Sequence, residues 1–434
     1  MSKSLEEIAE ELKKNAEKSE KPKKVQIIYA FNGTGKTRLS MEFKKLVSPK
    51  TILEKEIAKE NENLKKFEEN LEKAKRPEGK NKLNKMIEGI KGNIRDKENE
   101  LSNPPDSRTK ILYYNALTED LFYWNNEFEN EFHPTLKIQS NNFVNWVLHF
   151  FGDKDIIENF HRYTNTKLTP IFSNQDYDNE HPNRSWANEV SFSYEGGDER
   201  SKKKIKISHG EERCFIWSIF YTLIYYVLGD ISEQSDESEF KDLKYIFIDD
   251  PVSSLDDNYL ILLAVDLSKL IKSYKSTNIN FIITTHNALF YNVLFNELDR
   301  DDPVYEYKGS KNAICYVMRL QENGTYQLNP SNDSPFSYHL YLKKEIESAI
   351  KNNSIQKYHF HFVRQILEKL STFLGYKDWS KLLPEHSDYL KRLINLSSHA
   401  KYATEEISEI IPSDKEKLKE LIDYINKKYH FNEN

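Results

Sequence analysis

Residues 25–37 read Val-Gln-Ile-Ile-Tyr-Ala-Phe-Asn-Gly-Thr-Gly-Lys-Thr, and this order predicts a strand that leads into a phosphate-binding loop. The apolar run Val25–Phe31 is typical of a buried parallel strand. The glycines that follow it let backbone N–H groups wrap around phosphates. Ala30 stands where such loops usually carry their first glycine, and a small residue there can still make the turn. The residues expected to bind phosphates are Asn32, Gly33, Gly35, Lys36 and Thr37, with Thr37 also holding Mg²⁺.

Length and charge limit the class of protein. The chain has 434 residues, which is enough for two or three domains with a sizeable core. Its 63 Lys and Arg against 69 Asp and Glu give a net charge of −6, so any basic site must be local. Hydrophobic residues make up 38% of the chain, and 26 Tyr and 24 Phe predict a core rich in aromatic rings.

Cysteine usage and hydropathy favour a cytoplasmic protein with no membrane partner. Cys214 and Cys315 belong to no CxxC pair, which argues against a disulfide framework and against a cysteine-based zinc site. We expect no apolar run of the roughly 18 residues that span a membrane. Residues 1–24 are expected to form a charged helix rather than a signal peptide.

A second strand with carboxylates at its end lies downstream. Tyr245–Ile248 is apolar and leads into Asp249 and Asp250, which suit the orientation of Mg²⁺ and of an attacking water, respectively. A strand-end turn would explain one carboxylate but not two. The helical run Tyr259–Tyr274 and the strand Phe281–Ile283 follow, and strand, helix and strand in this order predict a parallel sheet.

Three shorter features, a segment at Ser208–Glu212, Asp256 and His286, complete a pattern that resembles an ABC-type ATPase head. Ser208-His-Gly-Glu-Glu212 opens a long helical run, and His209 stands where such segments usually have a glycine. Asp250 stands where ABC proteins usually have a catalytic glutamate. The resemblance implies a head-to-tail dimer around two nucleotides, either GTP or ATP with Mg²⁺. It gives roles to Ser208, Gly210 and Glu211 as signature loop, Asp249 and Asp250 as Walker B, Asp256 as D-loop and His286 as switch histidine.

Residues 51–100 differ in composition from the rest of the chain. They carry 13 Lys and Arg and 12 Asp and Glu, with apolar residues at three- and four-residue steps around a break at Arg76-Pro-Glu-Gly79. This spacing predicts a short coiled-coil hairpin of two antiparallel helices, inserted over 51–104. The alternative is one solvated helix followed by a linker.

From about Ser337 the pattern is helical to the end of the chain. Leu367, Leu370, Phe373 and Leu374 are expected on one apolar stripe. Residues 341–400 carry 10 Lys and Arg against 6 Asp and Glu, so a local surface that attracts RNA is expected there.

This helical region also holds a candidate ribonuclease set. Arg364 and Glu368 are four residues apart on one helical face, and His399 follows a second helical run. RNA cleavage by internal attack needs a base for the 2′-OH, an acid for the departing 5′-oxygen and a cation over the phosphorane, with no metal required. By base rates alone, an i,i+4 salt bridge on a solvated helix face is the more frequent explanation of Arg364 and Glu368. His399, which a second helix can bring close to Glu368, is the residue that favours the ribonuclease set.

Four segments carry a closer resemblance to the PrrC family of bacterial anticodon nucleases. They are Ile28-Tyr-Ala-Phe-Asn-Gly-Thr-Gly-Lys-Thr-Arg-Leu-Ser40, Tyr113-Tyr-Asn-Ala-Leu-Thr-Glu-Asp-Leu-Phe-Tyr-Trp124, Phe247-Ile-Asp-Asp-Pro-Val-Ser-Ser-Leu-Asp-Asp257 and Phe336-Ser-Tyr-His-Leu340. The resemblance covers nearly the whole chain, and the 51–104 hairpin is its main departure. It implies catalytic roles for Arg364, Glu368 and His399, and a role for Asp333 in reading the modified wobble base.

What this family does sets the expected function. The resemblance implies a phage-defence toxin that cuts a tRNA, typically lysine tRNA, beside the wobble base and leaves a 2′,3′-cyclic phosphate and a 5′-OH. It also implies silencing by a type I restriction-modification complex, release through a phage-encoded activator, activation by GTP or ATP hydrolysis and stabilisation by dTTP.

The expected architecture is an α/β ABC-type head over 1–330 and an all-α, HEPN-like nuclease domain over 331–434. The alternative is a defence ATPase whose helical tail docks a separate nuclease, which would not need His399. A DNA-repair head with a zipper-like hairpin is a weaker alternative, because each hairpin arm spans only about 35 Å.

Overall fold

In the computed structural model, the chain folds into two compact units, Met1–Pro335 and Phe336–Asn434, close to the boundary expected at 330. The structure describes residues 2–18, 20, 22–73, 76–104, 110–114, 122–125, 134–139, 153–164, 168–176, 186–194, 204–233, 238, 240–251, 255, 257–274, 277–321, 323–331, 338–384, 387–398 and 411–431.

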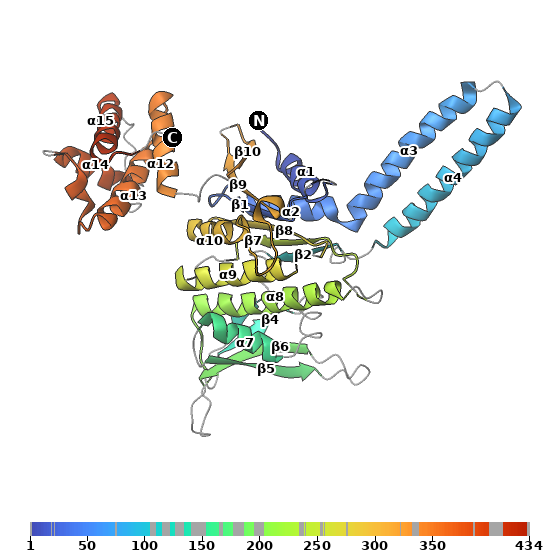
Figure 1. The fold of residues 1–434 in the computed structure, drawn as a ribbon, viewed down its shortest axis with the longest axis horizontal. Coiled ribbons are helices and arrows are strands. Elements are labelled where there is room, and N and C mark those ends of the chain that lie inside the picture. Colours follow the sequence, from blue (N-terminus) through green and yellow to red (C-terminus); the bar gives the residue numbers. More distant parts are fainter. Residues whose placement is uncertain are drawn as a thin grey trace. The chain divides into compact units, whose positions relative to one another are not determined.

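A six-stranded sheet forms the centre of the first unit (Figure 1). Its order is β10-β9-β1-β8-β7-β2, in which β10 is antiparallel to β9 and the other neighbours are parallel. The mostly parallel sheet agrees with the predicted strand–helix–strand pattern. The strands are β1 (Val25–Tyr29), β2 (Ile111–Tyr114), β7 (Tyr245–Asp249), β8 (Asn280–Thr285), β9 (Ala313–Leu320) and β10 (Tyr326–Pro330).

Helices cover both faces of this sheet (Figure 1). Alternate residues of a strand point to opposite faces, so Ile28 packs in the core with α1 and α2, whereas Tyr29 meets Tyr291 of α10 edge to face. The predicted aromatic core is present, and Phe43 of α2 contacts the rings of β7. The helices are α1 (Leu5–Ala16), α2 (Lys36–Val47), α9 (Asp257–Ser273) and α10 (Ala288–Leu298), with the short α11 (Gly309–Asn312) before β9.

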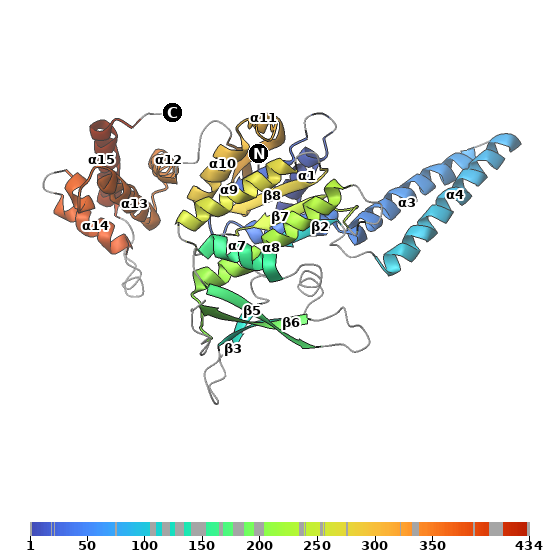
Figure 2. The same ribbon diagram turned by 60° about the horizontal axis from the view of Figure 1, so that its bottom comes forward.

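A second, antiparallel sheet of order β3-β4-β6-β5 lies in the same unit, with α7 and α8 between the two sheets (Figure 2). Among the described residues, α8 is long and apolar enough to cross a membrane, so the expectation that no such run exists was wrong. Of its apolar window, 67% is buried inside the protein, which explains the composition. The elements are β3 (Phe122–Asn125), β4 (Thr135–Ile138), α7 (Asp153–Thr164), β5 (Leu168–Asp176), β6 (Trp186–Tyr194) and α8 (His209–Ser232).

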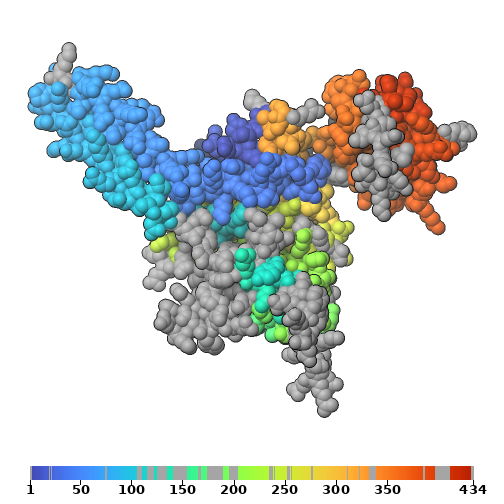
Figure 3. Space-filling view, turned by 180° about the vertical axis from the view of Figure 1, so that it is seen from behind, coloured from blue at the N-terminus to red at the C-terminus, as the bar shows by residue number. Residues whose placement is uncertain are grey.

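Helices α3 (Pro49–Lys73) and α4 (Pro77–Ser102) lie antiparallel along their length, on either side of the expected break (Figure 3). The ion pairs Lys97–Glu56 and Lys91–Glu68 join the two arms, at 2.9 and 3.1 Å. Leu53, Ile87 and Ile94 are buried, as the apolar spacing requires.

The second unit is a small helical bundle with its own core, which includes Ile346, Leu367 and Leu421. One prediction fails here, because Phe373 and Leu374 are exposed whereas Leu367 of the same expected stripe is buried. Helix α13 ends at Phe373, beyond the reach of its packing partners. The elements are α12 (Tyr338–Lys351), α13 (Lys357–Phe373), the 3₁₀ helix η2 (Trp379–Leu382), α14 (Asp388–Ser398) and α15 (Pro412–Tyr429).

Candidate functional site

The loop between β1 and α2 has the backbone that phosphate binding needs. Gly33 and Gly35 have φ values of 78° and 96°, in the left-handed region that favours glycine. Helix α2 begins directly at Lys36, so its N-terminal N–H groups face the loop. Ala30 does not have a positive φ, and its N–H donates to the Thr285 carbonyl at 2.9 Å. This position therefore does not require the glycine that is usual there.

Lys36 is buried inside the loop. Its Nζ donates to the carbonyl oxygens of Ala30 and Phe31 at 3.2 and 3.4 Å, and to Asn32 Oδ1 at 3.2 Å. Asp250 Oδ2 lies 3.5 Å from the same nitrogen. A buried ammonium is costly unless it is paired, and these partners offset the cost. Lys36 is thus fixed where it can meet the phosphates of a nucleotide.

Asp249 links the carboxyl ends of β7 and β8 to the N-terminal end of α2. Thr37 Oγ1 of α2 donates to its Oδ2 at 2.7 Å, and Thr284 Oγ1 of β8 donates to its Oδ1 at 2.5 Å. Burial raises the pKa of Asp249, and the hydrogen bonds from Thr284 and Thr37 oppose this shift. The Thr37 hydroxyl and the Asp249 carboxylate are the hard oxygen ligands that Mg²⁺ prefers, so the pair fits the ion.

Asp250 is held by Thr285, the last residue of β8, and by His286, which follows it. It has a positive φ of 54°, and its carboxylate accepts from His286 Nδ1 at 2.5 Å, from the His286 N–H at 3.2 Å and from Thr285 Oγ1 at 3.3 Å. Burial raises the pKa of Asp250, but the hydrogen bond from His286 and the charge of Lys36 outweigh it and hold the pKa below its ordinary value. A fixed, ionised carboxylate beside a histidine can orient a water.

The structure brings together Lys36, Thr37, Asp249, Asp250 and His286, which the sequence analysis had singled out separately. Thr284 and Thr285 were missed. Two hydroxyls at the end of a buried apolar strand are a usable signal, since buried polar groups need partners. Asp256, the expected D-loop residue, lies outside the described residues.

The expected signature segment starts α8. Ser208 is its N-cap and accepts from the Glu211 N–H at 3.3 Å, while the Ser208 N–H donates to Glu211 Oε2 at 2.8 Å. Gly210 lies in the first turn, and Glu212 Oε2 accepts from Trp124 Nε1 at 3.0 Å. This capping box fixes an exposed helix start. Glu212 and Trp124 were not predicted to interact.

In the second unit, Arg364 is held from three sides. Its Nε donates to Glu368 Oε1 at 2.7 Å, its Nη1 donates to Asn395 Oδ1 at 2.9 Å, and its guanidinium lies 5.7 Å from the ring centre of Trp379. The Arg364 side chain is 21% exposed and that of Glu368 is 47% exposed. An i,i+4 surface pair would not need the other two partners. Asn395 and Trp379 were missed, and His399 and Asp333 lie outside the described residues.

Glu368 also lines a groove of about 270 Å³ on α12 and α13. His339, Gln365, Lys369 and Thr372 form the rest of its wall. Burial, and then the charge of Lys369, lower the pKa of His339. A carboxylate, an ammonium and an imidazole line this groove, which suits a polar ligand.

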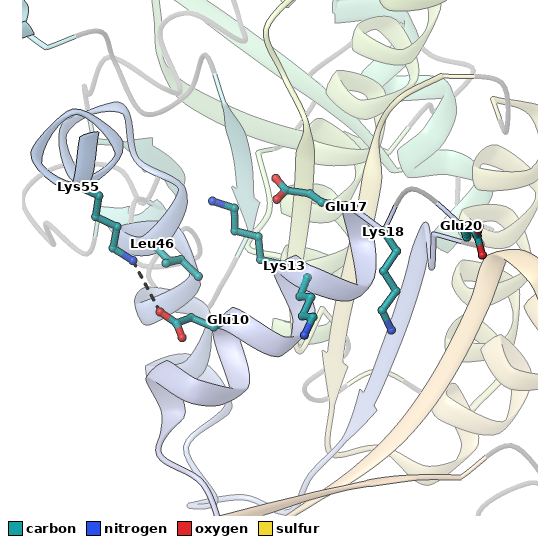
Figure 4. Close-up of a pocket in the computed structure, with 8 residues that line it drawn as sticks. Glu10, Lys13, Glu17, Lys18, Glu20, Leu46 and Lys55 are labelled. Atoms are coloured by element: carbon teal, nitrogen blue, oxygen red, sulfur yellow. Dashed lines mark ion pairs between the residues drawn. The ribbon is translucent and has the colours of Figure 1, made fainter. Parts of the chain in front are cut away.

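Another hollow, of about 700 Å³, lies between α1 and the start of α3 (Figure 4). Its walls carry both signs of charge, and Lys55 pairs with Glu10 across it at 3.7 Å. Glu17 on the same wall accepts from the Tyr245 hydroxyl at 2.5 Å. None of the phosphate-loop residues lines this hollow, so it is separate from the nucleotide residues.

The chain is similar to known proteins along nearly its whole length. A family profile described as "AAA domain" matches residues 192–431. A protein of Escherichia coli named "Anticodon nuclease" is 40% identical over 447 aligned positions, which cover 98% of this chain and 96% of that protein. A solved structure of the Smc head domain of Pyrococcus furiosus, with an extended coiled coil and bound to the C-terminal domain of ScpA, is 14% identical. It matches 75% of this chain and 64% of that one, with a TM-score of 0.25.

Proposed function

The chain belongs to the family of the Escherichia coli anticodon nuclease and carries an AAA domain, and from this premise we propose that it is a nucleotide-gated tRNA endoribonuclease. The observation that carries the proposal is the threefold fixation of Arg364 beside Glu368 at the wall of a polar groove. The side chains of an ion pair that has no role beyond the helix surface would be mobile. A catalytic cation, in contrast, has to be held in place before the substrate binds.

The proposed reaction is an internal transfer that needs no metal in the second unit. Glu368 takes the proton of the 2′-OH, whose oxygen attacks the adjacent phosphorus. His399 protonates the departing 5′-oxygen, and Arg364 stabilises the charge on the phosphorane. One P–O bond forms and one breaks, which leaves a 2′,3′-cyclic phosphate and a 5′-OH. The proposed cut lies beside the wobble base of a tRNA, with lysine tRNA as first candidate and Asp333 as a base reader.

The proposed gate is the nucleotide site of the first unit. Lys36 and the loop glycines would bind the phosphates of GTP or ATP, and Thr37 with Asp249 would hold Mg²⁺, which neutralises phosphate charge. Ser208, Gly210 and Glu211 of one protomer would complete the site of its partner in a head-to-tail dimer. A cytoplasmic location, a silencing restriction-modification complex and dTTP as a stabilising ligand belong to the same proposal.

Sequencing of 5′-OH ends tests the nuclease. Wild type, Glu368→Gln and His399→Ala are expressed under tight induction, and Glu420→Gln, an exposed glutamate of α15, is the matched control. We expect new ends within one anticodon loop in wild type and in the control, and none in the other two variants.

The rival assignment predicts a different result. If the second unit only docks a separate nuclease, His399→Ala keeps the toxicity of wild type. If the new tRNA ends persist in both His399→Ala and Glu368→Gln, another protein makes the cut.

A further inference from the structure

The end of α13 exposes an aromatic surface that the proposed chemistry does not use. Phe373 is 86% exposed, Tyr376 is 49% exposed, and Leu374 between them is 42% exposed. A fully exposed phenylalanine is costly in water, because it keeps a large apolar area hydrated. Residues 372–378 are all exposed, so the two rings stand on a continuous open segment.

The backbone under these rings is fixed. The Gly375 N–H donates to the Thr372 carbonyl at 3.2 Å, and the Tyr376 N–H donates to the Ser371 carbonyl at 2.8 Å. Together with the φ of 78° at Gly375, these bonds form a Schellman motif that ends the helix. Phe373 and Tyr376 are therefore presented on a capped helix end, which limits the entropy lost when a ligand covers them.

This surface continues the groove that contains Glu368. Gln365, Lys369 and Phe373 are spaced four residues apart, so they follow one another along the same face of α13. Gln365, Lys369 and Thr372 line the groove, and Phe373 is the next residue along that stripe. Lys369 before the rings and Lys377 after them are both exposed. The order along the helix is carboxylate, ammonium, aromatic ring.

We propose that Phe373 and Tyr376 form a stacking platform for unpaired bases of an RNA loop whose backbone enters the Glu368 groove. The inference rests on the proposed function and adds how the substrate is held. Unstacked bases of single-stranded loops bind proteins by stacking on aromatic rings, with basic groups along the phosphates. Duplex RNA keeps its bases paired and offers no such face.

The size and charge of the surface favour RNA over a protein partner. Two rings and one leucine are far smaller than the roughly 800 Å² that each partner buries in a stable protein interface. Lys369 and Lys377 on either side of the rings suit phosphates, and the carboxylate of Asp378, next to Lys377, is paired with Lys391 at 3.8 Å. A second copy of this chain would bring the same positive charges against them.

The test uses the full chain with Mg²⁺ and GTP or ATP, and an anticodon stem–loop of lysine tRNA as substrate. Phe373→Ala and Tyr376→Ala remove the rings, and Phe373→Trp keeps a stacking face. Tyr358→Ala is the matched control, because Tyr358 is an exposed aromatic at the other end of α13. Since Phe373 is exposed, its removal leaves the core packing intact, and thermal unfolding checks this.

We expect Phe373→Ala to raise KM by about 5-fold to 150-fold with little change in kcat, because stacking contributes about 1–3 kcal/mol per base. Phe373→Trp should restore KM to within about twofold of wild type, and Tyr358→Ala should leave it unchanged. In parallel, a stem–loop with 2-aminopurine in the loop should lose fluorescence on wild type and much less on Phe373→Ala, as stacking requires.

The outcomes separate the two proposals. If wild type cleaves and Phe373→Ala has the same KM and the same fluorescence, the platform is wrong and the nuclease stands. If wild type quenches the loop without cutting it and Phe373→Ala does not quench, the platform stands and the nuclease fails. If wild type neither binds nor cuts, both are wrong. A change of oligomeric state in Phe373→Ala with unchanged RNA binding overturns the platform in favour of a protein contact.

Discussion

Replacing Asn395 with alanine should slow RNA cleavage without unfolding the protein. Asn395 lies on α14, and its Oδ1 accepts from Arg364 Nη1 at 2.9 Å. It does not reach the scissile phosphate in the proposed mechanism, so it is a positioning residue for Arg364. The substitution leaves the Glu368 and Trp379 contacts of Arg364 in place.

The magnitude follows from the burial of this bond. A hydrogen bond to a charged group contributes about 1.5–3 kcal/mol, and solvent reduces this where the partners are partly exposed. Arg364 is 21% exposed and keeps its bond to Glu368 in the variant. The substitution therefore removes about 1 kcal/mol of the free energy that holds the guanidinium in its orientation. Because the cation acts on charge that develops in the transition state, the loss falls on kcat, by roughly 5-fold to 10-fold.

Single-turnover cleavage of an anticodon stem–loop with excess enzyme measures this step directly. Asn352→Ala, at an exposed asparagine after α12, is the matched control and should cleave like wild type. Arg364→Ala should remove cleavage altogether. If Asn395→Ala stays within twofold of wild type while Arg364→Ala is inactive, Asn395 does not set the orientation of Arg364.

Three further results are expected in the first unit. Thr37→Val removes the hydroxyl that donates to Asp249, so Mg²⁺-dependent nucleotide binding should weaken at least tenfold by fluorescence titration, while binding in EDTA changes much less; equal losses in both would contradict the metal role. The pKa of Asp250 is lowered, so its ionised form stabilises the fold above the ordinary aspartate range. The stability lost in Asp250→Asn should therefore be full near pH 7, begin to fall as the pH drops below about 4, and vanish only below the lowered pKa of the folded state; a constant difference in urea titrations would refute this. Gly35→Ala forces alanine to a φ of 96°, so thermal unfolding should report a loss of roughly 1–3 kcal/mol, and an unchanged Tm would show that the loop relaxes.

Much of the first unit was predictable because its signals are local. The strand at Val25–Tyr29 and the long helix that opens at Ser208 were predicted from short runs of sequence. The strand order was not predictable, since β2 and β9 join the sheet from distant parts of the chain. The apolar stripe of α13 misled at Phe373, because periodicity shows which residues share a face and not where the packing partner ends.

In the candidate site, too, local motifs predict some residues, whereas other contacts depend on the tertiary fold. Lys36, Asp249 and His286 follow from motifs at strand ends, where a parallel sheet gathers them. The Arg364–Asn395 bond spans 31 residues and two helices, and no short pattern encodes it. Trp379 reads from sequence as an ordinary core aromatic, and its position over Arg364 depends on the turn after α13.

The two arms of the α3–α4 hairpin have 25 and 26 residues, so the chain returns to where it left α2. The hairpin can therefore be shortened without moving the two points at which it joins the rest of the first unit. Paired deletions of about seven residues from each arm keep the apolar seam in register and leave the connection to the sheet unchanged. The tip is thus a place to attach a fluorophore or a surface tether, through which the motion of the head can be followed on single molecules during nucleotide turnover.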